Sequence, residues 1–435
     1  MNRRATSYGE AAFGETGAKA GRAGRGRVVS ATATERGDVR ADVAIVGAGP
    51  AGAVAALVLA RAGLDVVLID RAPFPRDKAC GDGLMPDALA ALRALGLADR
   101  ALAGARRLAA LRIYSPNGTP ISVDGDFAVL PRERLDACLC EAAVEAGARF
   151  LRPVRVVAPI DDDGGVAGVV GETPDGEKVL VHARMTVLAT GAGAGPLTAF
   201  GVCDRSQPSA TAARFYITLD SPASFDLDCL CISYERSICP GYGWIFPGPA
   251  GSFNVGVGYF YQAPPATRNL RQLMARFLDT FPPARDLARL GGCASPIRGA
   301  PLRTGMSGAR WSSPGLLVVG DAAGLTYPIS GEGIGKAMES GMLAAEIAGE
   351  GLRAGRTAEA IADAYAGALE AKYLRRFQAY TNAQRWVAHP GLVDFLARRA
   401  NAGTYVRRQI EGLVNETAEP GAILSLRGIL RSLFT

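Results

Sequence analysis

The sequence is poor in the residues from which most metal sites and catalytic triads are built. Only two histidines, His182 and His389, occur in 435 residues, which excludes a His-rich metal site and a triad with a histidine base. Both histidines are expected to be structural or exposed. The eight cysteines show no C-x-x-C spacing, so we predict no metal site and interpret the cysteines as reduced thiols.

Long apolar runs and blocks of like charge are also missing. No uninterrupted apolar run approaches the roughly 20 residues that a membrane span needs. The net charge of +6 is spread along the chain, which argues against nucleic acid as a partner but permits peripheral contact with an anionic membrane. Residues 1–40 lack an apolar h-region and helical periodicity, so we interpret them as a flexible tail rather than a signal peptide. We therefore expect a cytoplasmic protein.

The chain does contain a well-delimited glycine turn between Val43 and Asp70, in VAIVGAGPAGAVAALVLARAGLDVVLID. The glycines complete G-x-G-x-x-G directly after an apolar strand and before a helix, the pattern that places a pyrophosphate at the helix N-terminus. An acid at the tip of the next strand is typical of a contact with the adenosine ribose hydroxyls. The predicted dinucleotide-binding residues here are Gly47, Gly49, Pro50, Ala51, Gly52, Asp70 and Arg71.

A second glycine-rich turn, in LLVVGDAAGLTYPISGEGIGKAMESG (Leu316–Gly341), favours a flavin. We expect Asp321 to bond a ribityl hydroxyl. The backbone near Gly331, Gly333 and Ile334 would aim a helix dipole at the flavin edge where negative charge collects on reduction. Gly191 opens another glycine loop, in LATGAGAG, where the backbone is expected to pass close to the cofactor. The predicted cofactor is FAD.

The order of predicted elements indicates a mixed α/β (α+β) fold. Residues 41–200 and 300–350 are predicted to form a discontinuous Rossmann-type FAD-binding domain. Aromatic and β-branched runs predict an antiparallel-sheet substrate domain over 201–299, and amphipathic periodicity predicts a C-terminal helical region over 351–435. No internal repeat is present.

Four further segments resemble the geranylgeranyl reductase family of flavoproteins, which shares its architecture with the para-hydroxybenzoate hydroxylase group. The resemblance covers the chain from about Asp42 to its end. The segments are RDKACGDGL (Arg76–Leu84), RERLDACL (Arg132–Leu139), YGWIFP followed by NVGVG (Tyr242–Pro247 and Asn254–Gly258), and GDAAG with PISGEGI in the second flavin motif.

This resemblance implies that reduced FAD saturates isolated C=C bonds of a polyprenyl substrate, such as a geranylgeranyl lipid or a menaquinone, by hydride transfer from flavin N5. It places Gly81 and Arg132 near the cofactor and makes Cys80 the candidate catalytic residue, which could line the cleft, relay a proton or only pack. Tyr242, Trp244 and Phe246 alternate along a predicted strand and would wall the substrate cavity.

Several features leave alternatives open. LATGAGAG lacks the Asp-Gly pair of the related hydroxylases, and Gly324 stands where many of them have histidine. No second G-x-G-x-x-G follows a strand, so the electron donor is either NADPH or a reduced protein carrier. The alternative function is an FAD-dependent monooxygenase acting on a bulky hydrophobic metabolite; a halogenase or a non-catalytic flavin carrier is less favoured. Lys78 is expected to be solvated or to face a phosphate, and Glu332 to orient the helix turn or the flavin.

Overall fold

The computed structural model describes residues 38–203, 208–221, 224–261, 269–308, 310–387 and 389–420. Strand β1 (Asp38–Val46) begins inside the range that was predicted as a flexible tail. The rest of that predicted tail, residues 1–37, lies outside the described residues. So does 421–435, the end of the predicted helical region.

One sheet is built around five parallel strands in the order β17-β9-β1-β2-β6, with β16 added antiparallel to β17. Strands β7 and β8 extend it as an antiparallel pair beside β9. Strand β2 is a continuous run of buried apolar residues, as expected where helices cover both faces of a parallel sheet. The bounds are β2 (Val66–Ile69), β6 (Arg149–Leu151), β7 (Arg155–Asp162), β8 (Gly165–Glu172), β9 (Lys178–Leu188), β16 (Ser312–Ser313) and β17 (Leu316–Val318).

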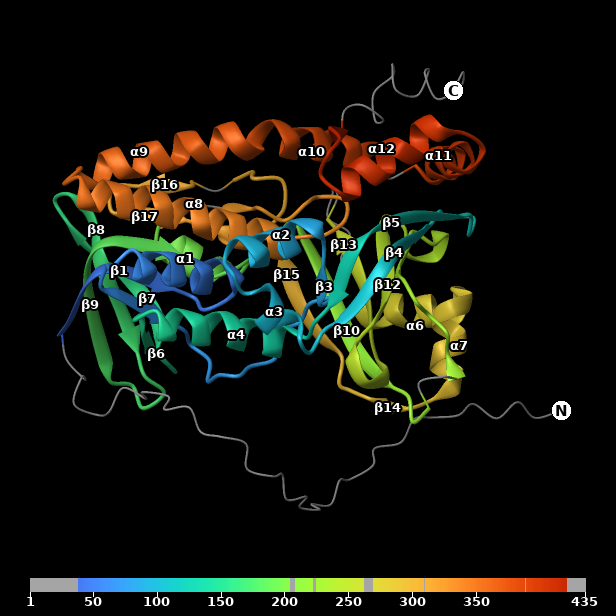
Figure 1. Ribbon diagram of the computed structural model, residues 1–435, viewed down its shortest axis with the longest axis horizontal. Helices are drawn as coiled ribbons and strands as arrows, with labels where there is room; N and C mark the ends of the chain where they lie inside the picture. The colour runs from blue at the N-terminus through green and yellow to red at the C-terminus, as the bar shows by residue number, and fades with distance from the viewer. Residues whose placement is uncertain are drawn as a thin grey trace, which may run out of the picture.

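Two helices that begin at glycine turns pack directly on each other beside this sheet (Figure 1). They are α1 (Pro50–Arg61) and α8 (Ile334–Arg353). A Cβ built on Gly341 of α8 would lie 2.3 Å from the carbonyl oxygen of Ala51, so only glycine allows this approach. The pair is contacted by α2 (Pro86–Ala94), α4 (Arg132–Glu145) and the 3₁₀ turn η5 (Gly320–Ala323), while α3 (Ala98–Leu102) packs on α2 and α4, and α5 (Ala194–Ala199) packs on β7.

A second sheet has the order β14-β10-β13-β12-β11-β4-β5-β3, with β15 paired to β10. Its pairs are antiparallel except for β11 with β4. Strands β3, β4 and β5 lie within 41–200, the range predicted for the first domain. They nevertheless belong to the second sheet, because β4 pairs with β11 and continues that sheet. The bounds are β3 (Gly83–Leu84), β4 (Arg106–Tyr114), β5 (Pro120–Val129), β10 (Ala210–Thr218), β11 (Leu230–Ser233), β12 (Gly241–Pro247), β13 (Ser252–Phe260), β14 (Cys293–Ala294) and β15 (Arg298–Leu302).

Helices cover the outer face of this second sheet and one side of the whole molecule (Figure 1). Helices α6 (Leu270–Thr280) and α7 (Pro282–Leu290) pack on the outer face, where Phe277 is fully buried. The 3₁₀ turn η3 (Arg236–Ile238) packs on α6, and the 3₁₀ turn η4 (Pro249–Gly251) connects β12 to β13. A nearly continuous rod of α9 (Ala358–Leu369), the π-helical turn η6 (Glu370–Leu374) and α10 (Arg375–Val387) lies along α8.

The last helices, α11 (Pro390–Ala402) and α12 (Thr404–Val414), pack on β5. Within the described ranges, no helix combines the length and apolarity required to cross a bilayer.

Candidate functional site

The two sheets meet at a cavity of about 820 Å³. One wall consists of the turns that follow the carboxyl ends of β1, β2, β9 and β17, the edge at which open α/β sheets bind ligands. The opposite wall consists of side chains from β10, β12 and β15. A group bound at the parallel sheet would therefore face the second sheet across one space.

The first glycine turn is shaped by close backbone contacts. Gly47 has φ +101°, and a Cβ there would lie 2.4 Å from the Ala189 carbonyl oxygen. A Cβ on Gly52 would lie 1.9 Å from the carbonyl oxygen of Gly47. Gly49 faces the cavity instead, and Pro50 opens α1 without an acid in its first turn. The positive end of α1 therefore points at the cavity with its N–H groups uncapped by side chains.

Two arginines flank the Gly49 position. A Cβ there would lie 3.7 Å from Nη2 of Arg132 and 3.9 Å from Nη2 of Arg76. The buried carboxylate of Asp136 orients both: it accepts two bonds from Arg132, at 2.7 and 2.8 Å, and lies 3.0 Å from Nη1 of Arg76. Two guanidinium groups beside a helix N-terminus fit the pyrophosphate of a dinucleotide. Sequence reasoning assigned no role to Arg76 or Asp136, although Arg76 starts a segment that carried the family resemblance.

The carboxylate of Asp70 closes the first turn. Its Oδ2 accepts the backbone N–H of Ala48 at 2.8 Å, and its Oδ1 accepts that of Ala72 at 2.8 Å. Arg71 is exposed and lines the same cavity. Asp70 thus holds the strand ends together at the cavity rim, and its contact with a ribose stays a prediction.

The second flavin motif forms the neighbouring part of the wall. Asp321 lies in η5 and its Oδ1 accepts the hydroxyl of Thr326 at 2.6 Å. A Cβ on Gly333 would lie 2.8 Å from that hydroxyl oxygen, so the turn before α8 needs glycine. Helix α8 starts at Ile334 without a side-chain cap and without an acid in its first turn. A second positive helix end therefore faces the cavity.

The glycine loop after β9 leaves space and an unpaired polar atom. Gly191 has φ +72°, and a Cβ placed on it would meet nothing within 4 Å, so the backbone is open to a bound group. The hydroxyl of Thr190 is buried and forms no hydrogen bond within the described chain. Together with the two helix ends and the arginine pair, this loop offers the donors that an FAD molecule requires, so the residues fit that cofactor.

The segment around Cys80 is held by a buried carboxylate. Asp82 adopts φ +63°, and its Oδ2 accepts the hydroxyl of Tyr216 at 2.5 Å and the amide Nδ2 of Asn254 at 2.8 Å. The same amide donates to the carbonyl oxygen of Cys80 at 2.8 Å, and Oδ1 of Asp82 accepts the backbone N–H of Arg132 at 3.2 Å. Burial raises the pKa of Asp82 to about 6, against the opposing effect of these hydrogen bonds.

Three aromatic rings of β12 form the opposite wall. Tyr242, Trp244 and Phe246 all line the cavity, with ring centroids 5.8 and 6.4 Å apart along the strand. The indole N–H of Trp244 donates to Oδ1 of Asn254 at 2.9 Å, so its buried polar atom is satisfied. The ring of Phe246 packs against Gly81, whose Cβ would lie 3.1 Å away. Cys80 and Gly81 therefore lie between the rings and the glycine turns.

Two further cations, Lys78 and Arg214, line the cavity. Lys78 lines the cavity, and burial together with the charge of Arg132 lowers its pKa. Arg214 on β10 is 1% exposed and pairs with Asp77. Nothing in the sequence indicated that Arg214, a lone arginine in a strand, would be buried beside the cavity. His182 and His389 do not line the cavity; the former is half-buried and the latter exposed.

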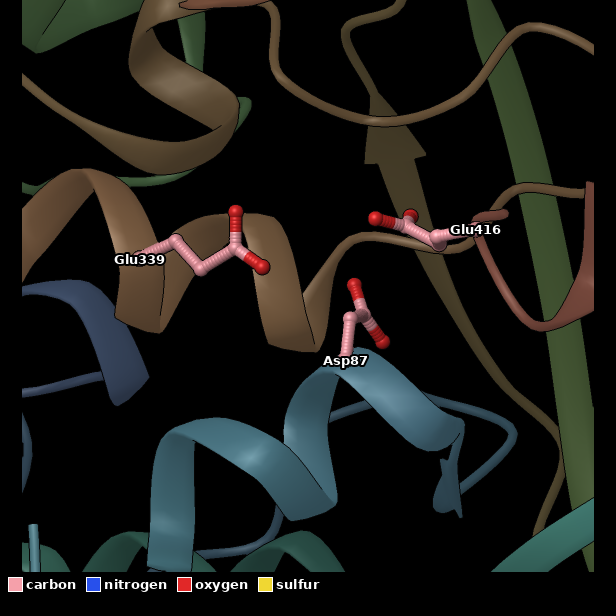
Figure 2. A group of neighbouring side chains, drawn as sticks. All are labelled: Asp87, Glu339 and Glu416. Carbon is pink, nitrogen blue, oxygen red and sulfur yellow. The ribbon is translucent and has the colours of Figure 1, made fainter. Parts of the chain in front are cut away.

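A cluster of charges adjoins the α8 end of the cavity. Figure 2 shows the carboxylates of Asp87, Glu339 and Glu416 turned toward one another from α2, α8 and the segment after α12. The ammonium of Lys336 lies 3.2, 3.0 and 2.7 Å from them, respectively. We call these four residues the Lys336 cluster. The ammonium of Lys336 is the positive charge that balances the three carboxylates. Sequence reasoning did not identify this cluster.

Comparisons with known proteins agree with this geometry. An FAD binding domain family model matches residues 40–229. The chain is 36% identical to the menaquinone reductase of Mycolicibacterium smegmatis over 71% of this chain and 76% of that protein. It is 32% identical to a digeranylgeranylglycerophospholipid reductase of Methanoculleus marisnigri, over 72% of this chain and 78% of that protein.

Two solved structures share the fold. A geranylgeranyl bacteriochlorophyll reductase-like protein of Thermoplasma acidophilum superposes with a TM-score of 0.72 at 24% identity, covering 91% of this chain and 96% of that one. A flavin-dependent brominase superposes with a TM-score of 0.71 at 21% identity, covering 91% and 99%. At these identities the likeness concerns the fold alone.

Proposed function

Since the chain belongs to the geranylgeranyl reductase family of FAD-dependent oxidoreductases, we propose that it saturates isolated C=C bonds of a polyprenyl substrate. The substrate class is a geranylgeranyl lipid or the side chain of a menaquinone-like quinone. The names of the relatives, a menaquinone reductase and a digeranylgeranylglycerophospholipid reductase, support this class.

The observation that carries the proposal is the composition of the cavity. Its parallel-sheet wall has two helix N-termini and an arginine pair that suit FAD, and its other wall has the rings of Tyr242, Trp244 and Phe246. A ring-lined wall is suited to a run of isoprene units, because such a substrate offers only apolar contacts. The cofactor and the alkene would therefore meet inside one space.

FAD, when bound and reduced, supplies the hydride that this reaction needs. The chain's own part is to align the alkene, exclude water and hold groups at fixed positions. The β12 rings align the isoprene units. The network of Asp82, Tyr216 and Asn254 fixes the loop that carries Cys80 between the rings and the glycine turns. We propose that Cys80 lines the reacting end of the cavity and that Gly81, Arg132, Asp321 and the glycine turns hold FAD.

Access to a polyprenyl substrate also belongs to the proposal. Such a substrate resides in a bilayer, so we propose a cytoplasmic protein that contacts the membrane peripherally. The electrons that reduce the bound FAD come from NADPH or from a reduced protein carrier. The net charge of +6 supports contact with an anionic surface.

The direct test is an anaerobic single turnover. The holoprotein, reduced with dithionite, is mixed with an unsaturated menaquinone or a digeranylgeranyl phospholipid. The mass of the product is then measured by mass spectrometry. We expect the addition of hydrogen pairs to the prenyl chain and none with the oxidised holoprotein. Oxygenated products that form only under air would contradict the proposal and favour a monooxygenase.

A second measurement separates these two functions without a substrate. The reduced holoprotein is mixed with oxygen in a stopped-flow instrument and the flavin spectrum is followed. We expect direct return to the oxidised spectrum. A long-lived oxygenated flavin species would favour the monooxygenase, a function that the same fold also serves in other proteins.

A further inference from the structure

A carboxyl group at the aromatic end of the cavity is not explained by cofactor binding. Glu332 lines the cavity in the turn before α8. Its neighbour Gly331 has φ +71°, and a Cβ there would lie 2.2 Å from the hydroxyl oxygen of Tyr242. The turn that carries Glu332 is therefore packed against the hydroxyl end of Tyr242, the first ring of the substrate wall.

We propose that Glu332 is the catalytic acid that gives the second hydrogen of the saturated bond, as a proton. This inference rests on the proposed function, because it assigns the proton that reduction of an isolated alkene requires. An unactivated alkene has no carbonyl oxygen to take negative charge, so its proton donor has to be close to the reacting carbon.

The environment of Glu332 keeps its proton in place. Burial is the main cause that raises the pKa of this carboxyl to about 8. Negative charge on Asp87 of α2 and on Glu416 after α12 acts in the same direction. Lys336 of α8 and a hydrogen bond with Ser330 oppose the rise.

The groups that face Glu332 from the remaining elements are tyrosines. Tyr242 lies on β12, Tyr234 follows β11 and Tyr380 lies on α10. Burial raises the pKa of each hydroxyl, and negative charge at Glu332 raises it further. These hydroxyls stay protonated across the working pH range, so Glu332 is the group of this set that changes charge near neutrality.

Among the carboxyls that line the cavity, Asp82 and Glu332 have raised pKa values and different tasks. Asp82, with a pKa of about 6, is mostly ionised at neutral pH and accepts hydrogen bonds from Tyr216 and Asn254. Glu332, with a pKa of about 8, is mostly protonated there. Two acids whose environments push their pKa values apart are typical of sites that separate a structural or basic role from an acidic one.

The step balances with the groups named. One alkene carbon receives the hydride from the reduced cofactor, which is oxidised by two electrons, and the other carbon receives the proton of Glu332. The C=C bond becomes a single bond and Glu332 is left as a carboxylate. A proton from water then restores the acid for the next turnover.

The test compares Glu332→Gln with a matched control, Glu346→Gln, on the exposed face of α8. The amide has nearly the shape of the neutral acid, so we expect normal folding and an unchanged flavin spectrum. We expect kcat for saturation to fall by about 100-fold or more with little change in KM, the usual effect of removing a general acid. In the wild type kcat falls as the pH rises through about 8, and this limb should be absent from the residual activity of Glu332→Gln.

A readout independent of turnover is the infrared spectrum of the oxidised holoprotein. Raising the pH from about 7.5, where Asp82 is already ionised, to about 9.5 should remove a protonated-carboxyl band in the wild type and in Glu346→Gln; Glu332→Gln should show no such loss. Absence of that band from the wild type, or normal kcat in Glu332→Gln, would overturn the inference. A wild type that saturates no prenyl substrate would instead refute the proposed function, whatever the infrared result.

Discussion

Replacing Lys336 with methionine would remove a buried cation that three carboxylates share. The lysine side chain is 2% exposed and that of Asp87 is 7% exposed, whereas Glu339 and Glu416 are partly open to solvent. Methionine has a similar length and no charge, so packing is largely kept. The variant Lys336→Met therefore isolates the electrostatic part of the Lys336 cluster.

The expected loss follows from the unpaired carboxylates. Removing one partner of a buried ion pair costs about 3–5 kcal/mol, and partial exposure of Glu339 and Glu416 favours the lower end, about 3 kcal/mol at neutral pH. Burial raises the pKa of Asp87 against the opposing charge of Lys336, so without the ammonium this pKa lies further above its value in the unfolded chain. The native variant then binds more protons than the unfolded one, so part of the lost stability returns as the pH falls toward about 5.

Urea unfolding of both proteins at about pH 7 and about pH 5 measures this loss. The control is Lys372→Met: Lys372 lies 3.7 Å from Glu339 and is 47% exposed, and an exposed pair contributes less than about 1 kcal/mol. The reasoning would be refuted if Lys336→Met lost no more stability than Lys372→Met. It would also be refuted if the loss were the same at both pH values.

Three further predictions concern the cavity. Arg76→Met should weaken FAD binding by about 10-fold or more, because it removes a charged donor from the Gly49 turn; fluorescence titration measures this, with exposed Arg93→Met as the control. Gly331→Ala should cost about 1–3 kcal/mol of stability, and Tyr242→Phe in the same chain should recover part of it, because the clash is with the Tyr242 hydroxyl. Cys80→Ala should lower kcat by about 10-fold through a misplaced alkene, and unchanged turnover would remove Cys80 from the mechanism.

Locally encoded features could be predicted from the sequence. The fold class, the cofactor FAD and the class of FAD-dependent oxidoreductase are confirmed by the family match and the relatives. The first glycine turn was recognisable because strand, turn, helix and acid lie within Val43–Asp70. The shared face of Tyr242, Trp244 and Phe246 follows from the two-residue period of a strand.

Features that depend on distant pairings could not be predicted in this way. Asp82 meets Tyr216 and Asn254 across 134 and 172 residues of chain, and no local pattern marks such partners. Strands β3–β5 join the second sheet because β4 pairs with β11, a contact between separate parts of the chain. The raised pKa of Glu332 likewise depends on burial by elements far apart in the sequence. A single glutamate between two glycines gives no sign of that environment.

The contact between Gly341 and Ala51 has a consequence for how the protein opens. It joins α1 and α8, whose N-termini face the two halves of the proposed cofactor site. The close packing of α1 on α8 therefore fixes the distance between their N-termini. An FAD molecule that contacts both N-termini would be held at that fixed spacing. We therefore expect any widening that admits a long isoprenoid to come from displacement of the wall formed by β10, β12 and β15, with the spacing of the two helix ends unchanged.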